Sequence, residues 1–380
     1  MHTAMINPVT KLASARGFAA LSSCSLLAEF GADISRHGPQ YIMAAGAGSE
    51  TESSQDSLHE GKLPTLIVFT HAGGLCKELW LPVWRRLLPQ LPRNCHLLAM
   101  DAPGHSDAPL PPNKNAGRDW PHWYHSALVQ AVHLHFGHYP AGSRLFGVGH
   151  SFGSIPLMQA AWAQGNPGSA ASQSSFMPAL RQLAHPLQHL LVLEPVLMPG
   201  DPGHDLHQEN ALWAHARTRT DSWPSTAAAQ SYFSSRKPLQ RWHPEALGMY
   251  AQVLTRGVEG CEGGVTLKCR REFEADCYRG YHRLWEAMRD ETASGGGAMG
   301  CTGTVLIAER DDVFGHAKDK KWQVQGGHTA MFEGVAKRWH APGGGGTPGA
   351  QAVHLPGCGH FAVQERPEAI AQHVLEMVRA

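Results

Sequence analysis

The sequence predicts an α/β fold in which a mostly parallel, twisted sheet is flanked by helices. Short apolar runs of strand length alternate with longer segments whose apolar residues recur at helical spacing. Several of these runs lack the polar alternation of a half-exposed strand, which is typical of parallel strands buried on both faces. Strands and helices that alternate in this way imply crossover connections between parallel strands.

The first strand, helix and second strand lie near the start of this pattern. Residues 66–70 form a continuous apolar run that predicts a buried strand, and the turn 71–74 follows it. Residues 78–88 have the apolar spacing of a helix. Residues 95–100 predict a second strand, which ends in the turn 101–107. This unit predicts the first crossover of the sheet.

The same alternation continues on both sides of a long interruption. We predict, in order, a helix over 120–136, a strand over 144–148, a helix over 152–163, strands over 190–193, 305–308 and 352–355, and a final helix over 367–378. Between residues 196 and 300 the pattern changes to aromatic-rich helical pieces. We therefore expect one domain over residues 61–380, with residues 196–300 as a helical lid inserted in it.

Residues 1–60 differ from the rest of the chain. Their middle is rich in alanine and serine, and the basic residues Lys11 and Arg16 precede the first acidic residue, Glu29. This composition is typical of an organellar transit segment and equally of a disordered tail. We expect a flexible N-terminal extension. The protein would then be cytoplasmic, or mitochondrial or plastid if the extension acts as a transit segment.

Composition limits the class of partner. The chain has 32 basic and 32 acidic residues, so its net charge favours neither nucleic acid nor an anionic membrane. No stretch approaches the roughly 18 apolar residues of a transmembrane helix. The eight cysteines form no CxxC pair, which is typical of free thiols in a reducing compartment. We expect a soluble protein that acts on a small molecule, and nothing here specifies its oligomeric state.

Gly149-His150-Ser151-Phe152-Gly153 matches the GxSxG pattern of a nucleophile elbow. In this motif a strained turn between strand and helix exposes the serine hydroxyl, and only small residues fit two positions to either side. The pattern alone is weak evidence, but here a predicted strand leads into it and a predicted helix leaves it. Ser151 is therefore the candidate nucleophile.

A serine nucleophile needs a base, and the base needs an acid to orient it. His360 lies on a glycine-bracketed loop after the last predicted strand and before the last helix, which makes it the candidate base. Asp311 follows the strand at 305–308 and is the candidate acid. Asp312, one residue on, and Glu194, which ends the preceding strand, remain alternatives.

The oxyanion that forms during attack needs hydrogen-bond donors. The backbone N–H of Phe152 is one candidate, because it follows the nucleophile. Gly73 and Gly74 are the others, since they lie in the turn after the first strand and let the backbone come close. Ligands bind at the carboxyl ends of strands in open α/β sheets, which is where this turn lies.

The chain resembles the α/β-hydrolase superfamily, and within it is similar to AB-hydrolase-1 enzymes of fungi and protists, including peroxisomal lipase-like members. The resemblance rests on the segments 71–80, 101–106, 149–153, 194–195, 265–269 and 359–361. It implies a Ser-His-Asp hydrolase of the α/β-hydrolase fold, with a helical lid between the sixth and seventh core strands. Two departures matter: Ala72 replaces the usual glycine after His71, which leaves the oxyanion donor open between Ala72, Gly73 and Gly74, and the chain lacks a terminal Ser-Lys-Leu.

Together these features predict a serine hydrolase that cleaves an ester or thioester of a hydrophobic small molecule through an acyl-enzyme. We expect neither a metal nor an organic cofactor, and serine at the elbow argues against the aspartate chemistry of epoxide hydrolases. Trp213, Trp223 and Trp242 either line an apolar pocket or pack the lid on the core. A carbon-carbon bond hydrolase, an acyltransferase and a non-catalytic ligand-binding protein remain alternatives.

Overall fold

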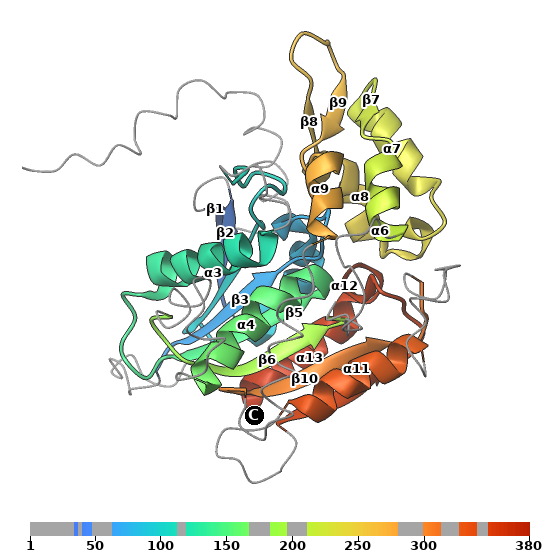
Figure 1. Cartoon of the computed structure of the whole chain (residues 1–380). Coiled ribbons are helices and arrows are strands. Elements are labelled where there is room, and N and C mark those ends of the chain that lie inside the picture. The colour runs from blue at the N-terminus through green and yellow to red at the C-terminus, as the bar shows by residue number, and fades with distance from the viewer. Residues whose placement is uncertain are drawn as a thin grey trace, which may run out of the picture.

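The computed structural model describes residues 34–36, 40–47, 63–111, 119–166, 183–195, 211–279, 299–312, 327–339 and 349–380. Its main sheet contains β1 (Ile34–Arg36), β2 (Tyr41–Ala45), β3 (Thr65–Thr70), β4 (Cys95–Met100), β5 (Arg144–His150), β6 (Leu187–Leu193), β10 (Thr302–Ala308) and β11 (Ala350–Leu355). The strand order is β1-β2-β4-β3-β5-β6-β10-β11 (Figure 1). All six predicted strands are therefore present, and several begin a few residues earlier than expected.

Neighbouring strands from β4 to β11 run parallel. In the main sheet, the β1–β2 and β2–β4 pairs are antiparallel. The prediction of a mostly parallel α/β sheet is confirmed. Because the strands are parallel, the loops that follow β3, β4, β5, β6, β10 and β11 meet at one edge of the sheet.

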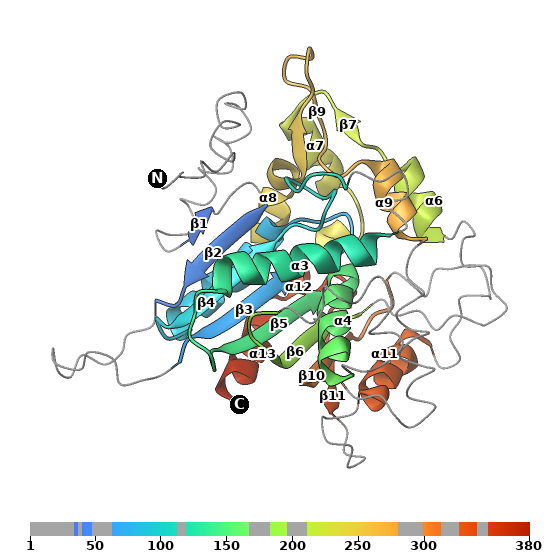
Figure 2. The same cartoon turned by 60° about the vertical axis from the view of Figure 1, so that its left-hand side comes forward.

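Helices cover both faces of the sheet (Figure 2). They are η2 (Lys77–Trp80), α2 (Leu81–Leu87), η3 (Leu88–Gln90), α3 (Trp120–Phe136), α4 (Ser154–Gly165), α11 (Gly327–Arg338), α12 (Ala362–Glu365) and α13 (Pro367–Arg379). Side chains of β3 alternate between two hydrophobic clusters: Leu66 and Val68 pack with α3 and α4, while Ile67 and Phe69 pack with α2 and α13. This explains why the strands show continuous apolar runs. No helix in the described ranges is long and apolar enough to cross a bilayer.

The first described residues differ from the prediction. Residues 34–36 and 41–45, assigned to the flexible extension, form β1 and β2, and β2 pairs along its whole length with β4. Ile42 and Ala44 of β2 join the hydrophobic core. Burial against α2 and pairing with β4 stabilise a segment whose composition alone indicated no strand. The expected transit segment lies otherwise outside the described residues.

A second unit is inserted between β6 and β10, which are neighbours in the sheet. We call its described residues, 211–279, the insertion. It comprises α6 (Ala211–Thr218), β7 (Ser222–Trp223), α7 (Thr226–Ser234), η6 (Leu239–Arg241), α8 (Pro244–Leu254), β8 (Thr255–Gly257), β9 (Val265–Leu267) and α9 (Arg271–Cys277). The three short strands form an antiparallel sheet in the order β7-β9-β8. The rest of the predicted lid, residues 196–210 and 280–298, lies outside the described residues.

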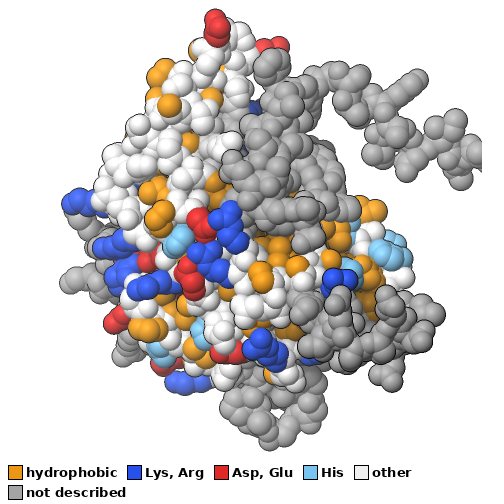
Figure 3. All heavy atoms as spheres, turned by 180° about the vertical axis from the view of Figure 1, so that it is seen from behind, with side chains coloured by type: hydrophobic (Ala, Val, Ile, Leu, Met, Phe, Trp, Pro, Cys, Tyr) orange, Lys and Arg blue, Asp and Glu red, His pale blue; other side chains and the backbone are white. Residues whose placement is uncertain are grey.

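Ion pairs and aromatic packing attach the insertion to the core. Glu245 at the start of α8 pairs with Arg85 and Arg86 of α2. Acidic and basic side chains lie side by side in this way on the surface seen from behind (Figure 3). Exposed pairs contribute only about 0–1 kcal/mol each. Buried Trp242 packs on half-buried Phe361, with ring centroids 5.4 Å apart, and this contact buries apolar surface next to His360.

Candidate active site

Ser151 lies on a strained turn between β5 and α4. It opens the short helix η4 (Ser151–Gly153) with φ of 53°, in the left-handed region that non-glycine residues rarely adopt. A Cβ at Gly149 would lie 2.6 Å from Ser154 Cα, and one at Gly153 would lie 2.5 Å from the carbonyl oxygen of His71. Only glycine fits these two positions, as the sequence pattern predicts. This is the geometry of a nucleophile elbow.

His360 lies within hydrogen-bonding distance of this serine. Its Nε2 is 2.9 Å from Ser151 Oγ, and both side chains are buried. On the other side of the ring, Nδ1 is 3.2 Å from Glu194 Oε2. If Nδ1 carries the proton and donates it to the carboxylate, Nε2 is left to accept the serine proton. The three side chains can therefore act as nucleophile, base and acid.

The position of the acid differs from our first choice. Glu194 directly follows β6, where its φ of 46° turns the side chain toward His360, and the backbone N–H of Ala308 donates to its Oε1 at 2.7 Å. Asp312 instead forms ion pairs with Arg241 at 3.0 Å and with Arg310 at 3.5 Å. Asp311 follows β10 and its side chain is partly exposed. The geometry therefore favours Glu194 over Asp311. Asp312 joins the insertion to the core.

The loop after β3 packs directly on the elbow. Thr70 Oγ1 donates to the carbonyl oxygen of Gly153 at 2.7 Å. A Cβ at Gly73 would lie 3.6 Å from Phe152 Cβ, whereas one at Gly74 would meet the carboxylate of Glu274. Gly73 is thus the glycine of this loop that lies beside Phe152. Of the candidate donors in the loop, the structure favours Gly73 over Gly74.

His71 connects this loop to the turn after β4. Its Nδ1 donates to the carbonyl oxygen of Ala72 at 2.8 Å, and its Nε2 accepts the backbone N–H of Ala102 at 2.9 Å. Both ring nitrogens are therefore used by backbone groups, which fixes the tautomer of a neutral imidazole. Burial lowers the pKa of His71 to about 3, so the ring stays neutral. The loop is held rigidly against its neighbour.

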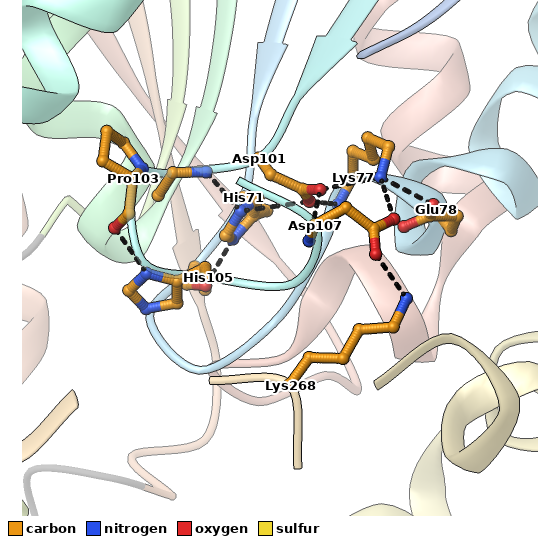
Figure 4. Close-up of polar contacts among 10 residues, drawn as sticks. His71, Lys77, Glu78, Asp101, Pro103, His105, Asp107 and Lys268 are labelled. Atoms are coloured by element: carbon orange, nitrogen blue, oxygen red, sulfur yellow. Dashed lines mark hydrogen bonds and ion pairs between the residues drawn. The ribbon is translucent and has the colours of Figure 1, made fainter. Parts of the chain in front are cut away.

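A buried group of charges completes the attachment of the two loops (Figure 4). Lys77 Nζ lies 2.7 Å from Asp101 Oδ2, 2.7 Å from Glu78 Oε1 and 3.1 Å from Asp107 Oδ2. Burial alone would lower the pKa of Lys77, but the carboxylates outweigh it and raise that pKa above its ordinary value. Lys268 of the insertion joins the same group, because its Nζ lies 3.0 Å from Asp107 Oδ1. These five residues tie the loop after β3, the turn after β4 and the insertion together.

His150 is a positioning residue that sequence analysis missed. Its Nε2 lies 2.8 Å from the carbonyl oxygen of His360 and donates to it. Burial lowers the pKa of His150 to about 3, so this ring is neutral and has one proton to donate. The only sequence signal is its place inside the GxSxG pattern, where the residue type is free to vary. Lys77 and Glu78 gave a second signal, as an adjacent pair of charged residues in the otherwise apolar run 75–81.

Buried neutral histidines predict a loss of stability in mild acid. Burial lowers the pKa values of His71, His105, His125 and His150 to about 3. An unfolded histidine has a pKa of about 6.5, so the unfolded chain binds more protons between these values. This contribution to stability is present above pH 6.5 and is lost as the pH falls toward 3. Burial raises the pKa of Asp101 to about 6, so this carboxyl binds its proton more tightly in the folded state and stabilises the fold as the pH falls. It is one group, whereas four histidines have the opposite effect.

We therefore expect the urea midpoint of unfolding to fall steadily from pH 7.5 to pH 5. The midpoint would be measured by fluorescence at several pH values and constant ionic strength. An unchanged or higher midpoint at pH 5 would contradict the burial of neutral histidines.

The tryptophans Trp223 and Trp242 pack against aromatic rings of the insertion, and Trp242 also packs on the core. Trp223 contacts Phe233, with ring centroids 5.0 Å apart, and Trp242 contacts Tyr250 at 4.7 Å. Both tryptophans are buried in the hydrophobic core. Trp213 lies next to the guanidinium group of Arg217. Of the two roles predicted for these residues, the structure favours packing. Within the described ranges no group of three or more His, Cys, Asp or Glu side chains is arranged to hold a metal ion.

Comparisons with known proteins agree with this geometry. The family model described as the alpha/beta hydrolase family matches residues 67–373. A sequence search of curated proteins gives no match. Among solved structures, a peroxisomal alpha-beta-hydrolase of Saccharomyces cerevisiae superposes with a TM-score of 0.59 at 14% identity, covering 90% of this chain and 85% of the other.

Two further solved structures have the same fold, and their names state other activities. The thioesterase domain from the curacin biosynthetic pathway has a TM-score of 0.56 at 14% identity, covering 90% of this chain and 98% of the other. An epoxide hydrolase from Vigna radiata has a TM-score of 0.53 at 16% identity, covering 91% of this chain and 98% of the other. At these identities the likeness shows the fold alone.

Proposed function

The chain belongs to the alpha/beta hydrolase family, and we propose that within this family it is a serine hydrolase that cleaves an ester or thioester of a hydrophobic small molecule. Family membership supports a hydrolase, while the site supports the choice of nucleophile. The observation that carries the proposal is the contact of 2.9 Å between His360 Nε2 and Ser151 Oγ on a strained elbow. A protein that only packs a serine there has no need of positive φ.

The reaction has two stages. Ser151 Oγ attacks the carbonyl carbon while its proton passes to His360 Nε2, and the pair of electrons of the carbonyl moves onto oxygen. Glu194 stabilises the imidazolium that forms. When the tetrahedral intermediate collapses, His360 gives the proton to the leaving alcohol or thiol. Water then repeats the sequence on the acyl-enzyme and releases the acid.

Aromatic side chains pack closely beside the nucleophile elbow. Phe152 stacks on Trp120 with ring centroids 3.6 Å apart and lies 5.8 Å from Tyr124. All three rings are buried. The insertion lies over the loops that carry the oxyanion donors, and we propose that it acts as a lid that excludes water during the reaction. A site closed to water in this way would favour a substrate with an acyl chain or ring.

Covalent labelling tests the nucleophile directly. A fluorophosphonate probe is expected to label wild type at Ser151 and to leave Ser151→Ala unlabelled, because the probe reacts only with an activated serine. Ser154→Ala is a matched control, since Ser154 is also buried and lies three residues further along the same turn. It should label like wild type. A folded wild type that neither labels nor hydrolyses p-nitrophenyl esters of increasing chain length would instead favour a ligand-binding protein.

A further inference from the structure

Helix α9 is the part of the insertion that packs on both site loops. A Cβ at Gly104 would lie 2.3 Å from the ring of Phe273, and one at Gly74 would lie 2.4 Å from Glu274 Oε1. Phe273 also contacts His105, with ring centroids 6.0 Å apart. There is no space between α9 and these loops for a side chain at either glycine. The residues of α9 and those directly after it are therefore held at a fixed position above the site.

Tyr278 follows α9 and places its hydroxyl beside the candidate oxyanion donors. A Cβ at Gly73 would lie 3.2 Å from Tyr278 Oη and 3.6 Å from Phe152 Cβ. The hydroxyl and Phe152 are thus on the same side of Gly73. Gly73 and Phe152 carry the two backbone N–H groups that we take as the candidate oxyanion donors. A third donor, an O–H, lies next to this pair.

The hydrogen bond between Tyr278 and Glu274 is weak. Its hydroxyl donates to Glu274 Oε1 at 3.4 Å, which is long for an O–H to oxygen contact. Glu274 also forms an ion pair with Arg219, so its carboxylate keeps a partner if the hydroxyl turns away. Turning the O–H away from Glu274 toward a newly formed oxyanion therefore exchanges a long hydrogen bond for one to a charged oxygen. A phenol is neutral at pH 7 and donates without losing its proton.

We propose that Tyr278 is a further catalytic residue, whose hydroxyl is a third donor of the oxyanion hole. The proposal rests on the proposed serine-hydrolase function. As the bond from Ser151 Oγ to the carbonyl carbon forms, the carbonyl electron pair moves onto oxygen and the serine proton moves to His360 Nε2. The Tyr278 O–H donates a hydrogen bond to that oxygen and keeps its own proton. It releases the oxygen when the carbonyl reforms and the alcohol leaves with the proton from His360.

The test compares Tyr278→Phe with Tyr232→Phe on p-nitrophenyl butyrate. Tyr232 is a matched control because it belongs to α7 of the insertion and packs on Trp223 at 5.4 Å. Loss of one oxyanion donor costs about 10²- to 10³-fold in kcat. We expect a fall of about 10²-fold in kcat for Tyr278→Phe with KM changed less than threefold, and no change above twofold for Tyr232→Phe. The inhibition constant of a boronic acid, which forms a tetrahedral adduct on serine, should rise by a similar factor.

The outcomes separate the two proposals. An active, labelled wild type whose Tyr278→Phe variant keeps kcat and boronic acid affinity within twofold overturns the role of Tyr278 alone. A change in KM with unchanged kcat overturns it as well, since uniform binding is not stabilisation of the transition state. A folded wild type with no labelling and no turnover overturns both proposals. Thermal unfolding of each variant shows whether a loss of activity is merely a loss of folding.

Discussion

Replacing Ser151 or His360 with alanine is expected to lower kcat on p-nitrophenyl esters by roughly 10⁴- to 10⁶-fold. Without the serine oxygen no acyl-enzyme forms, and without the imidazole the serine proton has no acceptor. The residues act as a unit, because Nε2 and Oγ are 2.9 Å apart. The double variant should therefore be no slower than either single variant. Steady-state kinetics of the three variants would measure this.

The control for these variants is the state of the fold. Both side chains are small contributors to the core, so circular dichroism and thermal unfolding should remain close to those of wild type. Losses that multiply in the double variant would indicate that the two residues act separately. That result would contradict a shared proton-transfer step.

Glu194→Gln is expected to lower kcat by roughly 10³- to 10⁴-fold while leaving KM nearly unchanged. The N–H of Ala308 donates to Glu194 Oε1 at 2.7 Å, so the amide oxygen of glutamine would occupy that position. The amide nitrogen would then face His360 Nδ1 and force the proton onto Nε2. This is the tautomer that cannot accept the serine proton.

Asp311→Asn is the matched comparison for Glu194→Gln. It makes the same change from carboxylate to amide on a partly exposed residue that follows β10, the strand next to β6. Its kcat should stay within about threefold of wild type, because Glu194 and not Asp311 is the carboxylate whose oxygen lies 3.2 Å from His360 Nδ1. If Asp311→Asn were the slow variant and Glu194→Gln the active one, the acid would be Asp311, as the sequence first indicated.

The core strands and the candidate nucleophile could be predicted from sequence because their signals are local. Strands buried on both faces require continuous apolar runs, and β3 shows such a run. The elbow requires glycine at 149 and 153 for steric reasons that any chain must obey. His360 followed from its place between the last strand and the last helix. These features depend on few residues that are close in sequence.

The acid and the first strands depend on contacts between distant residues. Glu194 and Asp311 both follow strands, and these strands, β6 and β10, are adjacent, so strand position cannot distinguish them. The backbone conformation at Glu194 and the N–H of Ala308 decide which carboxylate reaches His360. Similarly, β2 is recognisable only once β4 offers it a free edge. The packing role of Trp223 also emerged only from its neighbours in the insertion.

Positive φ at both Ser151 and Glu194 has a consequence for how this chain can change over time. Each such residue costs on the order of 1–3 kcal/mol, and glycine would adopt the same backbone without that cost. A descendant selected only for folding would therefore drift toward glycine at 151 and 194. Serine and glutamate persist at these two positions only under selection for chemistry, so natural variation there reports whether a given lineage still uses the reaction.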